Sequence, residues 1–217
     1  ISQEGVARDY QLVAVPLTAT YDSTGLADPL LDPTHGLRAA LSATPTHAFG
    51  KPSSNFVILQ ASGATYFDLS DLGISDPGRS VLALRGLVAS VQGASQFGLP
   101  PDQRLYAGGS GTVRGYDYQS IGPQFPDGKP IGGLSAEAAT IEFRQRLFEN
   151  FGAVAFVDAG QASDVSAPFT GTVRVGAGVG VRYYTPIGPL RVDVAVPLNR
   201  APRGAVFGIY IGLGQAF

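Results

Sequence analysis

Apolar residues alternate with small or polar residues along most of this chain. The most regular stretch is 173–185, VRVGAGVGVRYYT, where Val, Ala and Tyr at odd positions alternate with Arg, Gly and Tyr at even positions. Successive side chains of a strand point to opposite sides, so a period of two residues predicts a β-strand with one apolar face. After the turn residues PIG the alternation resumes at 190–198, and the two segments predict a hairpin.

The same period recurs along the rest of the chain. The segments that follow it are 10–22, 36–44, 56–69, 80–91, 137–147, 151–160, 173–185, 190–198 and 205–217. They make about nine strands, each about long enough to cross a bilayer when tilted. Turn residues follow each segment and no helical period is present, so we predict an all-β, antiparallel, up-and-down arrangement.

A soluble β-sandwich would show the same alternation, so the composition of the two faces has to distinguish between a sandwich and a barrel. In a sandwich the solvent face carries many charged side chains, whereas here only 15% of residues are charged and the second face is mainly Gly, Ala and Ser. Such a face suits a crowded lumen, and the Val, Leu, Ile and Phe face suits lipid. The sequence therefore favours a transmembrane β-barrel. The aromatic residues near segment ends, where interfacial girdles lie, are Tyr21, Phe67, Tyr183 and Phe217.

Composition excludes several other classes of protein. The 217 residues include 15 basic and 17 acidic side chains and no Cys, so neither nucleic-acid binding by charge nor a disulfide-stapled fold is indicated. The apolar runs are far shorter than the roughly 20 residues of a membrane-spanning helix, so any crossing must use strands. The chain begins at ISQEGVARDY without a Met or a signal-peptide pattern, and we expect further protein upstream.

One connection is much longer than the others. The stretch from about 92 to 134 joins two predicted strands, whereas FEN at 148–150 and PIG at 186–188 are tight turns. Its central part, RLYAGGSGTVRGYDYQSIGP, is rich in Gly and Tyr around Arg114. A loop of this length in a compact protein is usually functional.

The facing of nearby strands gives Arg114 two candidate partners. Glu142 and Asp158 lie on the small-residue face of neighbouring strands, about equally far from the turn at Asn150, so they should be opposite or diagonal. Two adjacent carboxylates repel unless a cation lies between them, and Arg presents a planar fork suited to carboxylates. We therefore predict that the loop folds back into the barrel and docks Arg114 on both acids. The alternative is an Arg114 side chain in solvent.

Catalytic, nucleotide and metal sites have little support. GGSGTVRGY lacks the G-K-[ST] ending of a phosphate loop, and the glycines of 176–180 lie on one strand face without the strand–turn–helix context of a dinucleotide site. His35 and His47 have no metal-ligand spacing. Ser110 with a histidine and Asp158 has no G-x-S-x-G elbow. We therefore predict no enzyme activity, no catalytic residues, no metal and no cofactor.

Three motifs, in order, resemble those of the outer-membrane protein 85 superfamily. VRGY at 113–116 resembles its loop motif, FVDAG at 156–160 its F-x-D-x-G strand motif, and GVGVRYYTPIGPLRVDVAVPL at 178–198 its penultimate hairpin. The surroundings of the loop motif and the ending GLGQAF are most similar to members that assemble autotransporters. The resemblance is strong over the second half of the chain and rests on pattern alone in the first half.

The resemblance implies an outer-membrane barrel of about sixteen strands, with its sixth extracellular loop inside the lumen and POTRA domains before it. The loop anchor it implies consists of Val113, Arg114, Gly115 and Tyr116. The lumen partners it implies for that anchor are Glu142, Phe156, Asp158 and Gly160. The terminal assembly strand, about 205–217, would face lipid through Phe207, Ile209, Ile211, Leu213 and Phe217. This chain has no POTRA domains and about nine of the strands, so we expect it to be the C-terminal portion of such a barrel.

The resemblance also implies a function. In that superfamily the first and last strands form a weakly paired seam that helps to fold or insert client β-barrels. We therefore expect an assembly or translocation factor of the bacterial outer membrane, surrounded by lipid, that acts on client β-barrel polypeptides such as autotransporters and on no nucleic acid. A periplasm-spanning inner-membrane partner is compatible with this expectation. Two alternatives stay open, a two-partner-secretion translocator and a passive pore or structural barrel, although a pore needs an open lumen.

Overall fold

The computed structural model of the protein describes residues 2–3, 6–7, 11–26, 31–49, 53–201, 204–214 and 216–217. The strands are β1 (Ser2–Gln3), β2 (Val6–Ala7), β3 (Gln11–Ala14), β4 (Leu17–Asp22), β5 (Gly36–Phe49), β6 (Ser54–Asp68), β7 (Ser80–Gln92), β8 (Ser135–Arg146), β9 (Phe151–Ser163), β10 (Arg174–Thr185), β11 (Gly188–Pro197) and β12 (Gly208–Leu213). Three 3-10 helices are η1 (Leu69–Leu72), η2 (Gln96–Gly98) and η3 (Pro101–Gln103). In the described part of the chain, no helix is long and apolar enough to span a membrane.

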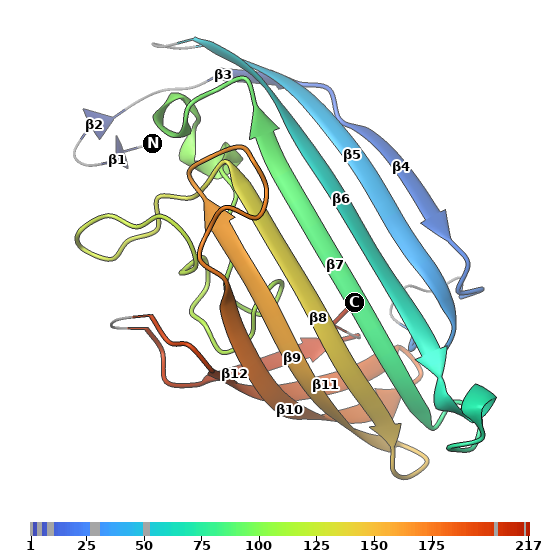
Figure 1. The fold of residues 1–217 in the computed structure, drawn as a ribbon. Helices are drawn as coiled ribbons and strands as arrows, with labels where there is room; N and C mark the ends of the chain where they lie inside the picture. The colour runs from blue at the N-terminus through green and yellow to red at the C-terminus, as the bar shows by residue number, and fades with distance from the viewer. Residues whose placement is uncertain are drawn as a thin grey trace.

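Apart from the β1–β2 hairpin, the strands form one curved antiparallel sheet (Figure 1). From β5 to β12 each strand pairs with the next one along the chain, and β3 and β4 both pair with β5. This order confirms the predicted up-and-down arrangement. One edge of the sheet is β12, and the other is formed by β3 and β4, which lie one after the other along β5. Among the described residues neither edge pairs with a further strand, so both edges are open.

The strand predicted over 10–22 is divided in two. Pro16 lies between β3 and β4 and has no backbone N–H to donate to the sheet. Val15 N still donates to Pro45 O at 3.0 Å, so the chain stays beside β5 across the break. If β3 and β4 are counted as one, the ten-stranded sheet has nine strand positions, as the alternation predicts. Residue 10 lies outside the described residues.

The two faces of the sheet differ as the alternation predicts. On the convex face, large apolar side chains such as Ile141, Val179 and Ile211 are exposed. Soluble proteins rarely expose a contiguous apolar surface of this kind, whereas a lipid-facing barrel wall requires one. Buried polar and charged side chains, among them Glu142 and Asp158, lie on the concave side, which we call the lumen.

The connection between β7 and β8 fills part of the lumen (Figure 1). Its apolar side chains and those of the surrounding strands form one buried cluster, which contains Ala48, Phe56, Ala89, Val91, Leu99, Leu105, Ala107, Val113, Tyr116, Ile121, Leu134, Ala136 and Ala162. Backbone bridges inside the loop, for example Leu105 with Gly133, give it local order. The loop is therefore a packed plug rather than a solvated connection.

The end of the chain departs from the predicted strand over 205–217. β12 ends at Leu213, and Gly214 adopts a left-handed φ of +81°, which glycine tolerates and which breaks the alternation. Phe217 then points into the lumen, where its ring stacks on Tyr66 with the centroids 6.4 Å apart. The prediction that Phe217 faces lipid is wrong for this reason.

The other residues assigned to the lipid face of this segment do lie outward. The exposed apolar side chains at this edge are Phe207, Ile209, Ile211 and Leu213. Three of the aromatic residues expected in interfacial girdles, Tyr21, Phe67 and Tyr183, are likewise exposed. The local turn at Gly214 therefore changes the environment of Phe217 alone within the terminal set.

An acidic side chain at Ile211 should impair membrane insertion. Ile211 is 81% exposed on the apolar face of β12. On the lipid face at the bilayer midplane, a basic residue lowers barrel stability by roughly 2–4 kcal/mol, and an acidic residue lowers it by less. We expect Ile211→Asp to lower the yield of heat-modifiable, membrane-inserted protein severalfold. Ile187→Asp is the matched control, because Ile187 is 65% exposed but lies in the turn between β10 and β11. Equal yields of the two variants would contradict the lipid-facing assignment.

Candidate functional site: an arginine anchor inside the lumen

Arg114 lies within the lumen and is only 2% exposed. Its Nε and Nη2 donate to the two carboxylate oxygens of Asp158 at 2.7 and 3.0 Å, and its backbone N–H donates to the same carboxylate at 3.0 Å. Nη1 donates to Glu142 at 3.0 Å. The structure thus brings Arg114 to both acids that the sequence analysis selected and leaves it out of solvent.

A third acid, Asp193 of β11, also binds Arg114. Arg114 Nη1 donates to Asp193 Oδ2 at 3.2 Å. Asp193 was not among the residues selected from the sequence. Its alternation with Val192 and Val194 nevertheless indicates that it lies on the lumen face. Alternation predicts the face of a residue, but it does not predict the curvature that brings β11 close to β8.

Two more arginines complete the network. Arg144 Nε donates to Glu142 at 2.9 Å, and Arg182 pairs with Asp193 and lies 3.8 Å from Glu142. Three guanidinium groups therefore face three buried carboxylates, and each of these six side chains is 2% exposed or less. Arg144 also pairs with the less buried Asp32 at 2.9 Å. Buried charges are tolerated only when they are paired and hydrogen-bonded. Removing one partner leaves the remaining charges buried without compensation. The six residues therefore act as one unit.

Phe156 gives the anchor a flat support. The guanidinium carbon of Arg114 lies 3.3 Å from the centroid of the Phe156 ring. A desolvated guanidinium over an aromatic face gains cation–π attraction in addition to its ion pairs. The F-x-D-x-G motif on β9 therefore supplies two contacts to Arg114, the ring of Phe156 and the carboxylate of Asp158.

Glycines make the space that the anchor occupies. A Cβ atom at Gly176 would collide with the Arg114 carbonyl oxygen, and one at Gly178 would collide with the Phe156 ring. On β9, a Cβ at Gly160 would lie 2.7 Å from Val113 Cγ2. Gly115 has a φ of +95°, and a Cβ there would lie 2.8 Å from the Val196 carbonyl carbon. The glycine face of β10 and the glycines of the two motifs thus form a slot for the loop.

Tyr116 ties the loop to the region around β11. Its hydroxyl donates to Asn199 Oδ1 at 2.8 Å and lies 3.1 Å from the Val175 carbonyl oxygen. Tyr210 of β12 accepts from the Gly115 N–H at 2.8 Å. Asn199 and Tyr210 were not selected from the sequence, because nothing in the local pattern says that a loop will contact them.

The charge of Arg114 is stable in this setting. Burial alone would lower the pKa of its guanidinium, but the hydrogen bonds and charge of Asp158, followed by the charges of Glu142 and Asp193, raise that pKa above its ordinary value. Arg114 therefore stays charged and can hold the loop through its ion pairs with the three acids. Across the described ranges, no group of three or more His, Cys, Asp or Glu side chains is placed to hold a metal ion.

An apolar outer wall, a polar lumen and a loop anchored inside by a buried arginine are the features of a membrane β-barrel wall with an internal loop. The Omp85 superfamily domain matches residues 2–217, and the chain belongs to this superfamily. Its members are outer-membrane barrels, and the outer membrane is where this chain resides.

Individual relatives agree with this assignment. The chain is 31% identical over 114 residues to the outer membrane protein assembly factor BamA of Nitratidesulfovibrio vulgaris, covering 50% of this chain and 14% of that protein. It is 26% identical over 155 residues to the same factor of Neisseria meningitidis, covering 55% of this chain and 19% of the relative. The chain thus spans less than a fifth of either relative.

A solved structure shows the same fold. The crystal structure of BamA from Haemophilus ducreyi lacking POTRA domains 1-3 superposes with a TM-score of 0.71 and 22% sequence identity, covering 90% of this chain and 41% of that one. At this identity the likeness shows the fold alone. It fits a chain that forms part of a larger barrel wall.

Arg114 and Asp158 should be coupled energetically. Removing one partner of a buried ion pair costs about 3–5 kcal/mol, so Arg114→Ala and Asp158→Ala should each lower the free energy of unfolding by about that amount. The double variant should cost about 1–3 kcal/mol less than the sum. The measurement is urea unfolding in lipid vesicles. The exposed pair Arg79 and Asp76, 3.2 Å apart, is the control cycle and should couple by less than about 1 kcal/mol. Simple additivity at Arg114 and Asp158 would disprove the anchor.

A side chain at Gly176 should expel the loop. Gly176→Val places a Cβ against the Arg114 carbonyl oxygen, whereas Gly86→Val, a matched change in β7, meets nothing within 4 Å. We expect the Gly176 variant to insert normally but to become susceptible to external protease within residues 93–134. The Gly86 variant should resist as the parent does. Full resistance of the Gly176 variant would show that the slot is not needed for docking.

Proposed function

We propose that the protein is an outer-membrane assembly factor that helps to fold, insert or secrete client β-barrel proteins, autotransporters among them. The observation that carries the proposal is the loop anchored by Arg114 in the lumen. The same loop motif and strand motif support membership of a superfamily whose relatives are named assembly factors. Because the chain covers only part of those relatives, its activity is a proposal about the whole protein.

The edge of β12 supports a role in handling other strands. Among the described residues β12 pairs only with β11, so its other edge offers unpaired N–H and C=O groups. In a membrane such groups need a partner, and an incoming strand can supply it. The exposed apolar residues of β12, Ile209 and Ile211, would present a continuous lipid face to that strand.

A passive pore is the weaker alternative. A pore needs a water-filled lumen, whereas here a buried cluster shared by loop and wall occupies part of it. A two-partner-secretion translocator would share the fold and is distinguished by its client, an exported polypeptide that is not itself a barrel. The autotransporter role rests on the loop context AGGSGTVRGYDYQSIGP and the ending GLGQAF, which resemble those of the autotransporter assembly factor TamA.

Depletion and complementation in the bacterium that carries the gene test the proposal. We expect depletion of the full-length protein to lower the amounts of β-barrel proteins, and of autotransporters in particular, in the outer membrane. The parent and Lys129→Ala should restore them, because Lys129 is exposed at the loop surface. Arg114→Ala should restore them severalfold less, because the loop loses its anchor. Both variants must first be shown to reach the membrane in equal amounts.

The outcomes separate the alternatives. Loss of autotransporters with other barrels unchanged would favour the TamA-like role, and loss of all barrels would favour the BamA-like one. Unchanged barrel levels combined with loss of one secreted non-barrel protein would favour a two-partner-secretion translocator. Unchanged levels of every client, with an open-pore conductance in planar bilayers, would reject the proposal in favour of a passive pore.

A further inference from the structure

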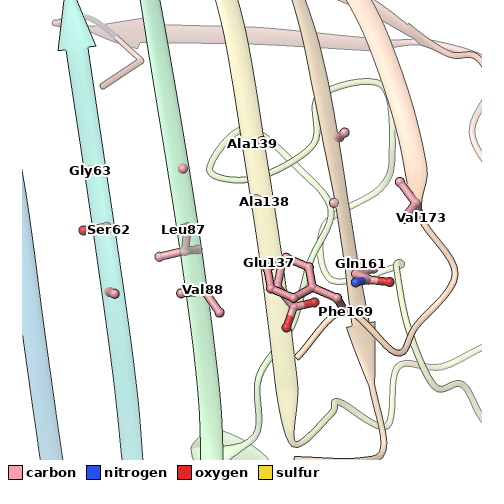
Figure 2. Close-up of a pocket in the computed structure, with 14 residues that line it drawn as sticks. Ser62, Gly63, Leu87, Val88, Glu137, Ala138, Ala139, Gln161, Phe169 and Val173 are labelled. Atoms are coloured by element: carbon pink, nitrogen blue, oxygen red, sulfur yellow. The ribbon is translucent and has the colours of Figure 1, made fainter. Parts of the chain in front are cut away.

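A groove of about 610 Å³ crosses the convex, lipid-facing side of the sheet from β6 to β9 (Figure 2). Its floor is one register row in which Gly63 pairs with Gly86, Gly86 with Ala139, and Ala139 with Ala159. In this row, four neighbouring strands present only Gly or Ala to the membrane. Since barrel strands are tilted by roughly 35–45°, a row perpendicular to them runs obliquely through the bilayer.

Packing within the protein does not require the two glycines of this row. A Cβ atom at Gly86 would meet nothing within 4 Å, and one at Gly63 would come no closer than 3.7 Å to any neighbour, the Arg38 carbonyl oxygen. Neither glycine has a positive φ. Glycine weakens a strand, so two glycines with room for side chains point to a space that is kept open for something outside the chain.

One row further along lies a buried carboxyl group. Glu137 pairs with Val88 and with Gln161, and Glu137 and Gln161 are 5% and 3% exposed. Neither carboxylate oxygen of Glu137, nor Gln161 Oε1, has a hydrogen-bond partner of good geometry. Only weak hydrogen bonds, from the Phe169 backbone and the Gln161 side chain, reach the carboxylate. An acceptor-only group buried without well-aligned donors is costly, and a ligand that donates N–H in good geometry would relieve that cost.

The loop between β9 and β10 covers this end of the groove. Ser90 Oγ donates to Ser166 O at 2.6 Å, and Ser135 Oγ donates to Ala167 O at 3.3 Å, so the loop is fixed over the outer face of β7 and β8. Phe169 lies beside Glu137 in Figure 2 and has a left-handed φ of +64°. The loop therefore makes a wall against which a bound molecule could rest.

Glu137 also lies at the border of the apolar band. Along β8, the outward residues that follow Glu137 are Ala139, Ile141 and Phe143, and the outward residue that precedes it is Ser135. The groove therefore has an apolar floor at the depth of acyl chains and a carboxyl group where the apolar band ends, at the level expected for headgroups.

We propose that this groove binds a membrane lipid, with one acyl chain on the Gly/Ala row and an ammonium headgroup that donates N–H to Glu137. An acyl chain fits a floor of Gly and Ala, and a primary ammonium supplies both the opposite charge and the well-aligned donors that the Glu137 carboxylate lacks. A choline headgroup carries the charge without an N–H donor and should bind more weakly. The site lies away from the β12 edge and from the lumen, and it does not depend on the proposed assembly function.

Tryptophan fluorescence can test this proposal. The chain has no Trp, so Phe169→Trp in the full-length protein adds a reporter above the groove, measured as the difference from the parent. The variant is reconstituted into vesicles in which phosphatidylethanolamine or phosphatidylcholine with brominated acyl chains replaces its unlabelled counterpart. We expect quenching to saturate at about tenfold lower mole fraction for the ethanolamine lipid than for the choline lipid.

Three further variants make the result specific. Gly86→Leu fills the floor and should abolish the saturable quenching by both lipids, whereas Ala155→Leu, an outward change elsewhere on β9, should leave it intact. Glu137→Gln should bring the ethanolamine lipid to the level of the choline lipid. Quenching that rises linearly with both lipids and ignores Gly86→Leu would mean annular lipid only and would overturn the proposal. Absence of quenching, with cross-links from position 169 to a second polypeptide, would also overturn it.

Discussion

Burying the charge of Arg114 is the constraint on which the rest of this structure depends. A guanidinium removed from water costs several kcal/mol unless acceptors replace its hydration, and the acceptors here come from three different strands. Glu142 lies on β8, Asp158 on β9 and Asp193 on β11, so these strands must curve until they converge on one side chain. The glycine face of β10, which runs between β9 and β11, follows from the same constraint, because the anchor occupies the space that side chains would need.

The same cluster divides the molecule into two different environments. Inside, polar and charged groups satisfy one another and the loop completes an apolar core with the wall. On the outer face, exposed apolar side chains such as Ile211 and the row of small residues that includes Gly86 suit contact with lipid. At the border of the apolar band, Glu137 and the loop bearing Phe169 break this pattern.

Alternation along the chain was sufficient to predict the strands, their order and their faces, because a period of two residues is a local property. It also placed Glu142 and Asp158 side by side, since both lie near one tight turn. The contacts of Asp193 and Tyr210 depend on how far the whole sheet curves, and no local pattern encodes that distance. The facing of Phe217 was predicted wrongly for the opposite reason, because a single left-handed residue, Gly214, breaks the alternation before it.

The positions of the three acids in the sequence have a consequence for folding. Arg114 precedes all of its partners, and the contact with Asp193 spans 79 residues. Contacts between residues so far apart form slowly, since a long segment must be ordered before they contribute stability. The anchor is complete only when the strand that carries Asp193 has joined the wall, so the docked loop marks a wall that has finished forming, and a loop still free in the lumen marks one that has not.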